Sequence, residues 1–300
     1  MRLQSFIEQA TRNPQKTVAV AAAEHLEVID AVVEAVKLNL ANFTLFGNKQ
    51  EILNIINEHY PWLSKHENIR IIHANSKDHA AESAVKNVKL HEADVLMKGN
   101  ISTTTLLKAV LNKDHGLRNG NVLSHVAVFE IPGYDRLKIV TDAAMNIAPN
   151  LEQKVEIVKN AVTVAKWIGI EYPKIAILAA VELVNPSMQA TLDGAALAQM
   201  NKRGQIADCL IDGPMALDNA ISKFAAKQKG LISDVAGVAD ILLVPTIEVG
   251  NVLYKSLVYF ANARVGAVIA GAKAPIVLTS RADNADSKLF SLALALCTGK

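Results

Sequence analysis

Residues 280–288 place an arginine and two carboxylates where one apolar stretch ends and another begins. The segment reads SRADNADSK, with Arg281 followed by Asp283 and Asp286. The apolar run before it predicts a buried strand, and the run after it predicts a helix over 284–297. A guanidinium is unfavourable beside the positive end of a helix dipole unless an anion lies between them. Phosphate is the natural candidate, because a guanidinium can bind it through two parallel hydrogen bonds.

A purely structural explanation of this segment stays open on the residues alone. Asp283 and Asp286 are three positions apart, which would put them on one face of a helix near its favourable N-terminal end. Arg281 would then pair with one of the two carboxylates. Thr279 or Ser280 is expected to cap the helix in either interpretation.

A second polar cluster follows the strand expected over 94–97. Lys98 and Gly99 come directly after that strand, and Ser102 and Thr103 open the next expected helix. A helix N-terminus with hydroxyl groups and a nearby lysine can bind an anion, and ligands of open α/β sheets bind beyond the carboxyl ends of the strands. The alternative is that Ser102 simply caps the helix.

Two later strands also end in polar residues. Pro214 is expected in the first turn of a helix, and Asp212 is expected to be a cap rather than a site residue. Gly250 permits a special backbone conformation, and Asn251 can cap the helix that carries Lys255. Lys255 would lie one turn into that helix and face the same side as the loop before it. The alternative is that Lys255 is simply a solvated surface lysine.

The composition excludes several classes of protein. A net charge of +2 and 5% aromatic residues do not favour nucleic acid or an anionic membrane as a partner. The two cysteines are far apart, which is typical of a reducing compartment, and no uncharged apolar run reaches roughly 18 residues. The N-terminus does not resemble a signal peptide. We therefore expect a cytoplasmic protein that does not enter a membrane.

Several sequence motifs of cofactor and metal sites are absent. The chain contains no GxGxxG, GxxxxGK[ST], GxSxG or HExxH, and its eight histidines show no metal-ligand spacing. No metal site is therefore expected.

Short apolar runs alternate with longer amphipathic segments along the chain. Strands are expected at 17–23, 43–47, 69–74, 94–97, 125–131, 137–141, 174–180, 209–211, 241–245, 266–269 and 276–279. Helices are expected at about 25–40, 49–58, 77–91, 102–113, 151–168, 190–202, 215–228, 251–262 and 284–297. This alternation predicts an α/β fold of mostly parallel sheets flanked by helices. The turn sequence at 132–135 predicts a β-hairpin over 125–141 and the first crossing between two lobes.

Five stretches in order resemble one protein family. They are ADVLMKGNISTTTLLKAVLN (93–112), VLSHVAVFEIPGYDRLKIVTDAAMNIAPNL (122–151), IDGPMALDNAIS (211–222), ADILLVPTIEVGNVLYKSL (239–257) and GAKAPIVLTSRAD (271–283). Together they resemble the phosphate acetyltransferase/phosphate butyryltransferase family, and most closely its phosphate butyryltransferase branch. The resemblance runs from about residue 93 to the end of the chain.

The resemblance implies an enzyme that transfers a short acyl group reversibly between coenzyme A and inorganic phosphate. It implies two α/β lobes with isocitrate/isopropylmalate-dehydrogenase-like layering, one of 1–129 plus 274–300 and one of 130–273. The active site is then expected in the cleft between the lobes. The expected partners are acyl-CoA and phosphate, with CoA as co-substrate, no permanently bound cofactor and a homodimer or higher homo-oligomer.

The resemblance also implies roles for particular residues. Ser280 and Arg281 would hold phosphate, and Asp286 or Asp283 would be the base, with Asp286 preferred narrowly. Contacts to phosphate or CoA are expected at Lys98, Gly99, Ser102, Thr103, Arg118, Ser124, Asn251 and Lys255. Acetyl-specific relatives often carry a cysteine where this chain has Ala143, so a thiol-dependent property is not expected here.

Three other functions remain open on the sequence. The first is a phosphate acetyltransferase, which differs in acyl chain length alone. The second is a non-catalytic acyl-CoA-binding module, which the acidic and basic residues at 280–286 disfavour. The third is a two-lobe dehydrogenase, which the missing dinucleotide motif disfavours.

Overall fold

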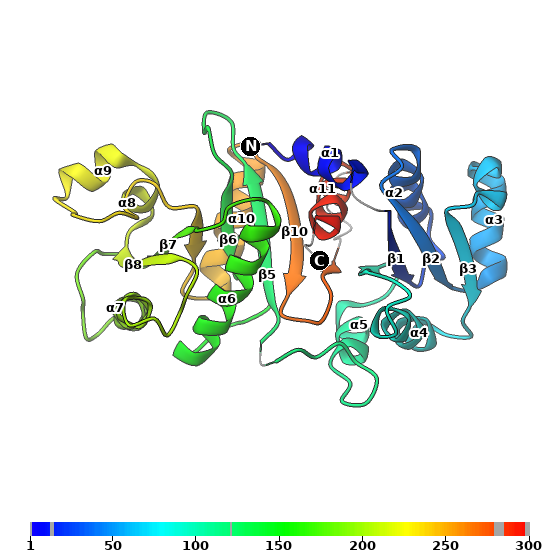
Figure 1. Ribbon diagram of the computed structural model, residues 1–300, viewed down its shortest axis with the longest axis horizontal. Coiled ribbons are helices and arrows are strands. Elements are labelled where there is room, and N and C mark those ends of the chain that lie inside the picture. Colours follow the sequence, from blue (N-terminus) through cyan, green and yellow to red (C-terminus); the bar gives the residue numbers. More distant parts are fainter. Residues whose placement is uncertain (1, 13–14, 121, 279–284, 298–300) are drawn as a thin grey trace. The chain divides into compact units, whose positions relative to one another are not determined.

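The computed structural model describes residues 2–12, 15–120, 122–278 and 285–297 (Figure 1). The chain forms two compact units. The N-terminal unit consists of Leu3–Gly120 and Gly266–Lys300, and the central unit consists of Met1–Arg2 and Asn121–Val265.

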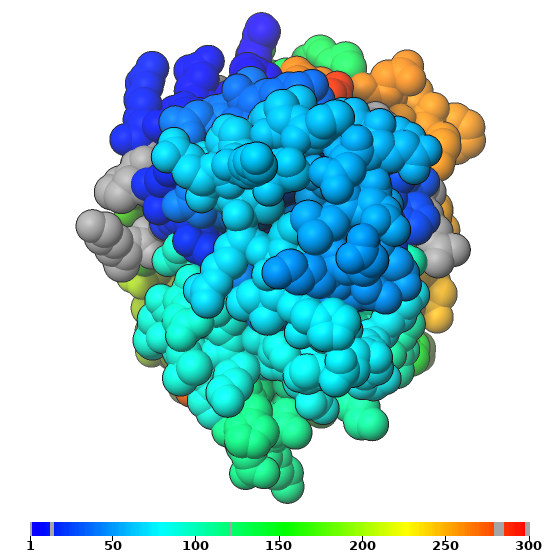
Figure 2. All heavy atoms as spheres, turned by 90° about the vertical axis from the view of Figure 1, so that its right-hand side faces the viewer, coloured from blue at the N-terminus to red at the C-terminus, as the bar shows by residue number. Residues whose placement is uncertain are grey.

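The sheet of the N-terminal unit has the strand order β3-β2-β1-β4-β11-β10. Its strands are β1 (Lys16–Ala21), β2 (Ala41–Gly47), β3 (Ile69–His73), β4 (Val95–Lys98), β10 (Arg264–Ala270) and β11 (Ile276–Val277). Its pairs are parallel except for β10 with β11. Most residues of β1 and β4 are buried, because helices cover both faces of a parallel sheet. The strand at the edge is β3, whose residues are only partly buried; Figure 2 views the molecule from this side.

Helices lie on both faces of this sheet (Figure 1). Those that follow β1 and β2 lie on one face with the two terminal helices, and those that follow β3 and β4 lie on the other. The chain reverses its direction along the sheet after β3, and right-handed crossovers then require the opposite face. The first face carries α1 (Gln4–Arg12), α2 (Leu26–Lys37), α3 (Lys49–His59) and α11 (Ala285–Leu296), and the second carries α4 (Lys77–Lys89) and α5 (Thr103–Val110). A 3-10 helix, Pro61–Lys65, follows α3.

The central unit contains a second run of strands in the order β5-β6-β9-β7-β8. They are β5 (Ser124–Glu130), β6 (Lys138–Thr141), β7 (Lys174–Leu178), β8 (Leu210–Met215) and β9 (Ile241–Leu243). The pair β5–β6 is antiparallel, and the other pairs are parallel. The helices of this unit are α6 (Leu151–Trp167), α7 (Gln189–Lys202), α8 (Leu217–Ile221), α9 (Lys223–Gln228) and α10 (Ile247–Tyr259).

The predicted α/β class and the hairpin over 125–141 are confirmed. Most strand pairs are parallel and flanked by helices, and β5 pairs with β6 across the turn at 132–135. The helix expected over 215–228 is divided at Ser222, whose hydroxyl accepts a hydrogen bond from the amide of Ala225 and caps α9. The helix α1 and the 3-10 helix were not predicted.

Three local predictions were wrong. Pro214 lies in β8 rather than in a helical turn, and β8 is last in the strand order, where a residue without an N–H group is tolerated. Asn251 does not cap a helix, because α10 already begins at Ile247. Gly250 serves close packing instead, since a Cβ atom there would lie 2.6 Å from the carbonyl oxygen of Asp142.

Within the described part of the chain, every helix is too short or too polar to cross a membrane.

Candidate functional site

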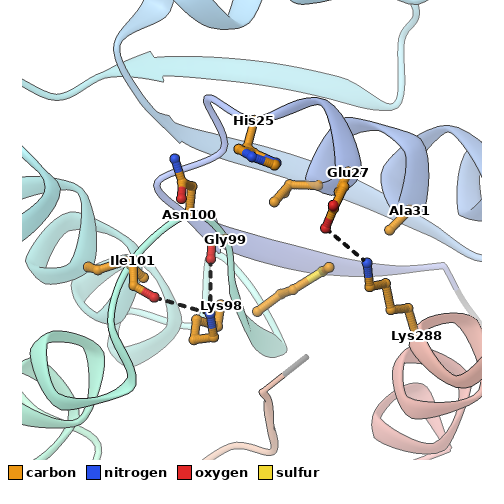
Figure 3. A pocket seen from close by; sticks show the side chains of 10 residues that line it. His25, Glu27, Ala31, Lys98, Gly99, Asn100, Ile101 and Lys288 are labelled. Carbon is orange, nitrogen blue, oxygen red and sulfur yellow. Dashed lines mark hydrogen bonds and ion pairs between the residues drawn. The ribbon is translucent and has the colours of Figure 1, made fainter. Parts of the chain in front are cut away.

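A small cavity of about 70 Å³ lies at the carboxyl ends of β1 and β4 (Figure 3). These strands are neighbours in the sheet, with Ala21 of β1 opposite Lys98 of β4. The helices that follow them, α2 and α5, lie on opposite faces, so the chain opens a crevice where ligands of α/β proteins bind. The cavity is lined by His25, Glu27, Val28, Ala31, Met97, Lys98, Gly99, Asn100, Ile101 and Lys288.

One wall of the cavity is formed by backbone atoms that pack so closely that residue 99 must be a glycine. The amide of Gly99 donates to the carbonyl oxygen of Ala21 at 2.9 Å, and the amide of Asn100 donates to that of Ala22 at 2.6 Å. A Cβ atom on Gly99 would lie 2.6 Å from the Ala21 oxygen and closer still to the Ala22 oxygen. The loop after β4 is therefore fixed against the loop after β1, where Ala22 has a φ of +61°.

Lys98 organises the loop that it begins. Its ammonium donates to the carbonyl oxygens of Gly99 at 3.2 Å and Ile101 at 3.1 Å, as Figure 3 shows. These bonds curl residues 98–101 around the ammonium and keep its positive charge at the cavity wall. The structure thus brings Lys98 and Gly99, both predicted from sequence, into one cavity.

The hydroxyl groups after this loop lie outside the cavity lining. Ser102 is the N-cap of α5, and its Oγ accepts a hydrogen bond from the amide of Thr105 at 3.0 Å. Ser102 and Thr103 are exposed. In this structure the Ser102 hydroxyl therefore serves as a cap, which was the alternative interpretation of the cluster.

The last helix contributes a lysine that the sequence analysis did not select. Lys288 lines the cavity, with its Nζ atom 3.5 Å from Oε2 of Glu27 in α2. Its side chain is only 13% exposed. A usable signal was present, because Lys288 directly precedes the apolar run Leu289–Leu296 and so stands where the buried face of the helix begins.

Asp286 lies in the first turn of α11 and is exposed. It is two residues before Lys288, which corresponds to about 200° around a helix, and it is not among the residues that line the cavity. The helix is fixed against β10, since a Cβ atom on Gly266 would lie 2.9 Å from the backbone of Phe290. Ser280, Arg281 and Asp283, and the expected cap at Thr279 or Ser280, lie outside the described residues.

Arg118 also belongs to the N-terminal unit, and its side chain is exposed. It forms an isolated antiparallel bridge with Ala272, and the amide of Lys273 donates to the carbonyl oxygen of Leu117 at 2.8 Å. These contacts fix the segment before residue 120 against the segment between β10 and β11. Arg118 is not among the cavity-lining residues.

Three predicted binding residues lie in the central unit. Ser124 is fully buried in β5, and its Oγ accepts a hydrogen bond from Nδ2 of Asn160 at 2.9 Å. Asn251 and Lys255 are exposed on α10. Asp142, which follows β6, is buried, and its carboxylate accepts hydrogen bonds from the amides of residues 144–146. This aspartate is therefore accounted for by the turn that it caps.

The described residues hold no group of three or more histidine, cysteine or acidic side chains placed to bind a metal. Cys209 and Cys297 are both buried, and burial raises the pKa of each thiol from 9.0 to about 11. Both thiols are therefore neutral near pH 7, and a neutral thiol is a poor nucleophile.

Comparisons with known proteins agree with the resemblance drawn from the motifs. The model of the family "Phosphate acetyl/butaryl transferase" matches residues 56–296. A probable phosphate butyryltransferase of Bacillus subtilis is 57% identical over 100% of this chain and 99% of that protein. A phosphate acetyltransferase of Thermotoga maritima is 46% identical over 98% of this chain and 99% of that protein. The crystal structure of a branched-chain phosphotransacylase from Enterococcus faecalis matches with a TM-score of 0.83 and 38% identity, covering 95% of this chain and 99% of that one.

Proposed function

This chain belongs to the phosphate acetyl/butaryl transferase family, and we propose that it transfers a short acyl group reversibly between coenzyme A and inorganic phosphate. The proposed reaction is butanoyl-CoA plus phosphate giving butanoyl phosphate plus CoA. The observation that carries the proposal is the 57% identity over the whole chain with a relative named for this activity. The cavity beyond β1 and β4, which Lys98 and Lys288 line, is consistent with two substrates that both carry phosphate.

The chemistry is an acyl substitution. A phosphate oxygen attacks the thioester carbonyl carbon, a C–O bond forms, and the C–S bond then breaks with the electron pair leaving on sulfur. In the reverse direction, the CoA thiol must lose a proton to attack the acyl phosphate, so a carboxylate base helps. We assign phosphate to Ser280 and Arg281 and the base to Asp286 or Asp283. Asp286 lies in the first turn of α11 and is exposed, so a substrate could reach it.

The finer architecture belongs to the same proposal. We propose two lobes, 1–129 plus 274–300 and 130–273, with isocitrate/isopropylmalate-dehydrogenase-like layering and the active site in the cleft between them. We also propose a homodimer or higher homo-oligomer in the cytoplasm, with CoA as co-substrate. The similarity to the Enterococcus faecalis phosphotransacylase over 95% of the chain supports the fold.

A steady-state assay tests the function. Acyl-CoA substrates from C2 to C6 are supplied with and without phosphate, and free CoA is measured with a thiol reagent. We expect phosphate-dependent release of CoA, with the highest kcat/KM near C4. Tight CoA binding without phosphate-dependent turnover of any of these substrates would instead identify a non-catalytic acyl-CoA-binding module.

Phosphate acetyltransferase is the second candidate, because the Thermotoga maritima relative carries that name at 46% identity. Acetyl and butanoyl differ by two methylene groups, each worth about 0.8 kcal/mol when buried. Discrimination by size therefore reaches about 15-fold in kcat/KM. Direct competition of acetyl-CoA with butanoyl-CoA decides between the two names.

A further inference from the structure

The positive charge of Lys288 is poorly compensated for a side chain that is largely buried. Its side chain is 13% exposed, while that of its partner Glu27 is 53% exposed. The distance between Nζ and Oε2 is 3.5 Å, which is longer than a charge-assisted hydrogen bond of 2.7–2.9 Å. A largely buried cation needs close anionic or hydrogen-bonding partners. The Glu27 carboxylate, which lies half in water, meets that need only partly.

The surroundings of this ammonium favour a second anion. Among the described residues, two lysine ammonium groups and one carboxylate line the cavity, so these side chains together carry a net positive charge. The N-terminus of the twelve-residue helix α2 also lies at the cavity, and the side chain of its N-cap residue His25 makes no capping hydrogen bond. The positive end of the helix dipole adds to the lysine charges.

The cavity limits the size of that anion. A volume of about 70 Å³ suits a compact tetrahedral group and excludes a whole CoA molecule. We propose that this cavity binds a phosphoryl group, with Lys288 as its main cation and Glu27 as a carboxylate that competes for the same ammonium. The proposal deepens the proposed function and rests on it for the source of the group, which is either inorganic phosphate or a phosphate of CoA.

This arrangement predicts opposite effects from the two partners of one ion pair. Lys288→Gln removes the cation and should weaken binding by about 10-fold or more, the usual effect of losing a charge-assisted hydrogen bond. Glu27→Gln removes the competing carboxylate and should tighten binding about 2- to 5-fold, an effect limited by the exposure of Glu27 to solvent. A purely structural ion pair would lower stability in both variants and tighten binding in neither.

The experiment measures equilibrium binding without turnover. Isothermal titration calorimetry at constant ionic strength gives Kd for inorganic phosphate, CoA and 3′-dephospho-CoA in the wild type, Lys288→Gln, Glu27→Gln and Lys288→Arg. If the group is inorganic phosphate, the phosphate Kd alone changes. If it is the 3′-phosphate of CoA, the CoA Kd changes and that of dephospho-CoA does not. If it is the pyrophosphate of CoA, the Kd values of CoA and of dephospho-CoA change together.

Lys37→Gln is the matched control, because Lys37 pairs with Glu34 at an exposed site on α2, the helix that also carries Glu27. It should leave every Kd unchanged. Unchanged Kd values in Lys288→Gln, or weaker binding in Glu27→Gln, would overturn the proposal. If Lys288→Gln does not fold, Glu27→Gln decides alone, with tighter binding in support and unchanged or weaker binding against. Binding without acyl transfer would refute the proposed function but not the phosphoryl site.

Discussion

Replacing Gly99 with alanine tests whether the backbone wall of the cavity is required. The new Cβ atom would lie 2.6 Å from the carbonyl oxygen of Ala21 and closer still to that of Ala22. An ordinary contact of this kind is 3.4–4 Å, and both oxygens are backbone atoms that cannot rotate away. The loop after β4 must therefore move away from the loop after β1.

That movement stretches two hydrogen bonds, from the amide of Gly99 to Ala21 and from the amide of Asn100 to Ala22. Each contributes about 0.5–1.5 kcal/mol, and overpacking a buried site costs about 1–3 kcal/mol. We expect Gly99→Ala to lower the free energy of unfolding by about 3 kcal/mol. For a domain of 150–250 residues this corresponds to a fall in Tm of about 6–12 °C.

Thermal unfolding, followed by circular dichroism, gives the Tm, and the steady-state assay gives the KM for phosphate. In Gly99→Ala the Tm should fall and the KM for phosphate should rise, because the loop carries Lys98 into the cavity. The control is Gly194→Ala in the central unit, where a Cβ atom would lie 3.0 Å from Pro214 and the added helix propensity of alanine offsets the strain. A Gly99→Ala protein whose Tm and phosphate KM match those of the wild type would refute the reasoning.

The remaining predictions concern buried titratable groups. Cys209 and Cys297 should not react with a thiol reagent in the folded protein at pH 8, because burial raises their pKa to about 11; immediate labelling of either would contradict this. The unfolded chain releases these protons first, near pH 9, so stability should fall between pH 9 and 11 by up to about 1.4 kcal/mol per pKa unit of difference, measured by urea denaturation. Lys154→Met should cost about 3–5 kcal/mol, because it leaves Asp193 buried without the ammonium that lies 2.5 Å from it. Lys154→Met combined with Asp193→Leu should recover much of that loss in urea denaturation, and an equally unstable double variant would show that the buried charge is not the cause.

The local order of apolar and polar residues determined much of the fold. Buried parallel strands have continuous apolar runs, and the turn at 132–135 required a hairpin because its residues favour a tight reversal. The five motifs identified the family because they carry residue types in a fixed order, and that information is local to each stretch.

Sequence reasoning failed where one residue serves a distant neighbour. Gly250 was interpreted as a residue that permits a special backbone conformation, but its missing side chain lets α10 pack against Asp142, which is more than a hundred positions away. Pro214 was assigned to a helix because nothing local shows that β8 lies last in its sheet. Ser102 illustrates a choice that sequence left open, since capping and anion binding use the same hydroxyl.

The cavity itself was decided by tertiary structure. The position of Lys98 and Gly99 at the carboxyl end of a strand, where ligands of α/β sheets bind, could be predicted from the apolar run that precedes them. The pairing of Lys288 with Glu27 could not be predicted, because the two residues are separated by almost the whole chain and meet only when α11 packs beside α2. Which side chains share a cavity depends on how distant elements pack, and local sequence patterns carry little information about that packing.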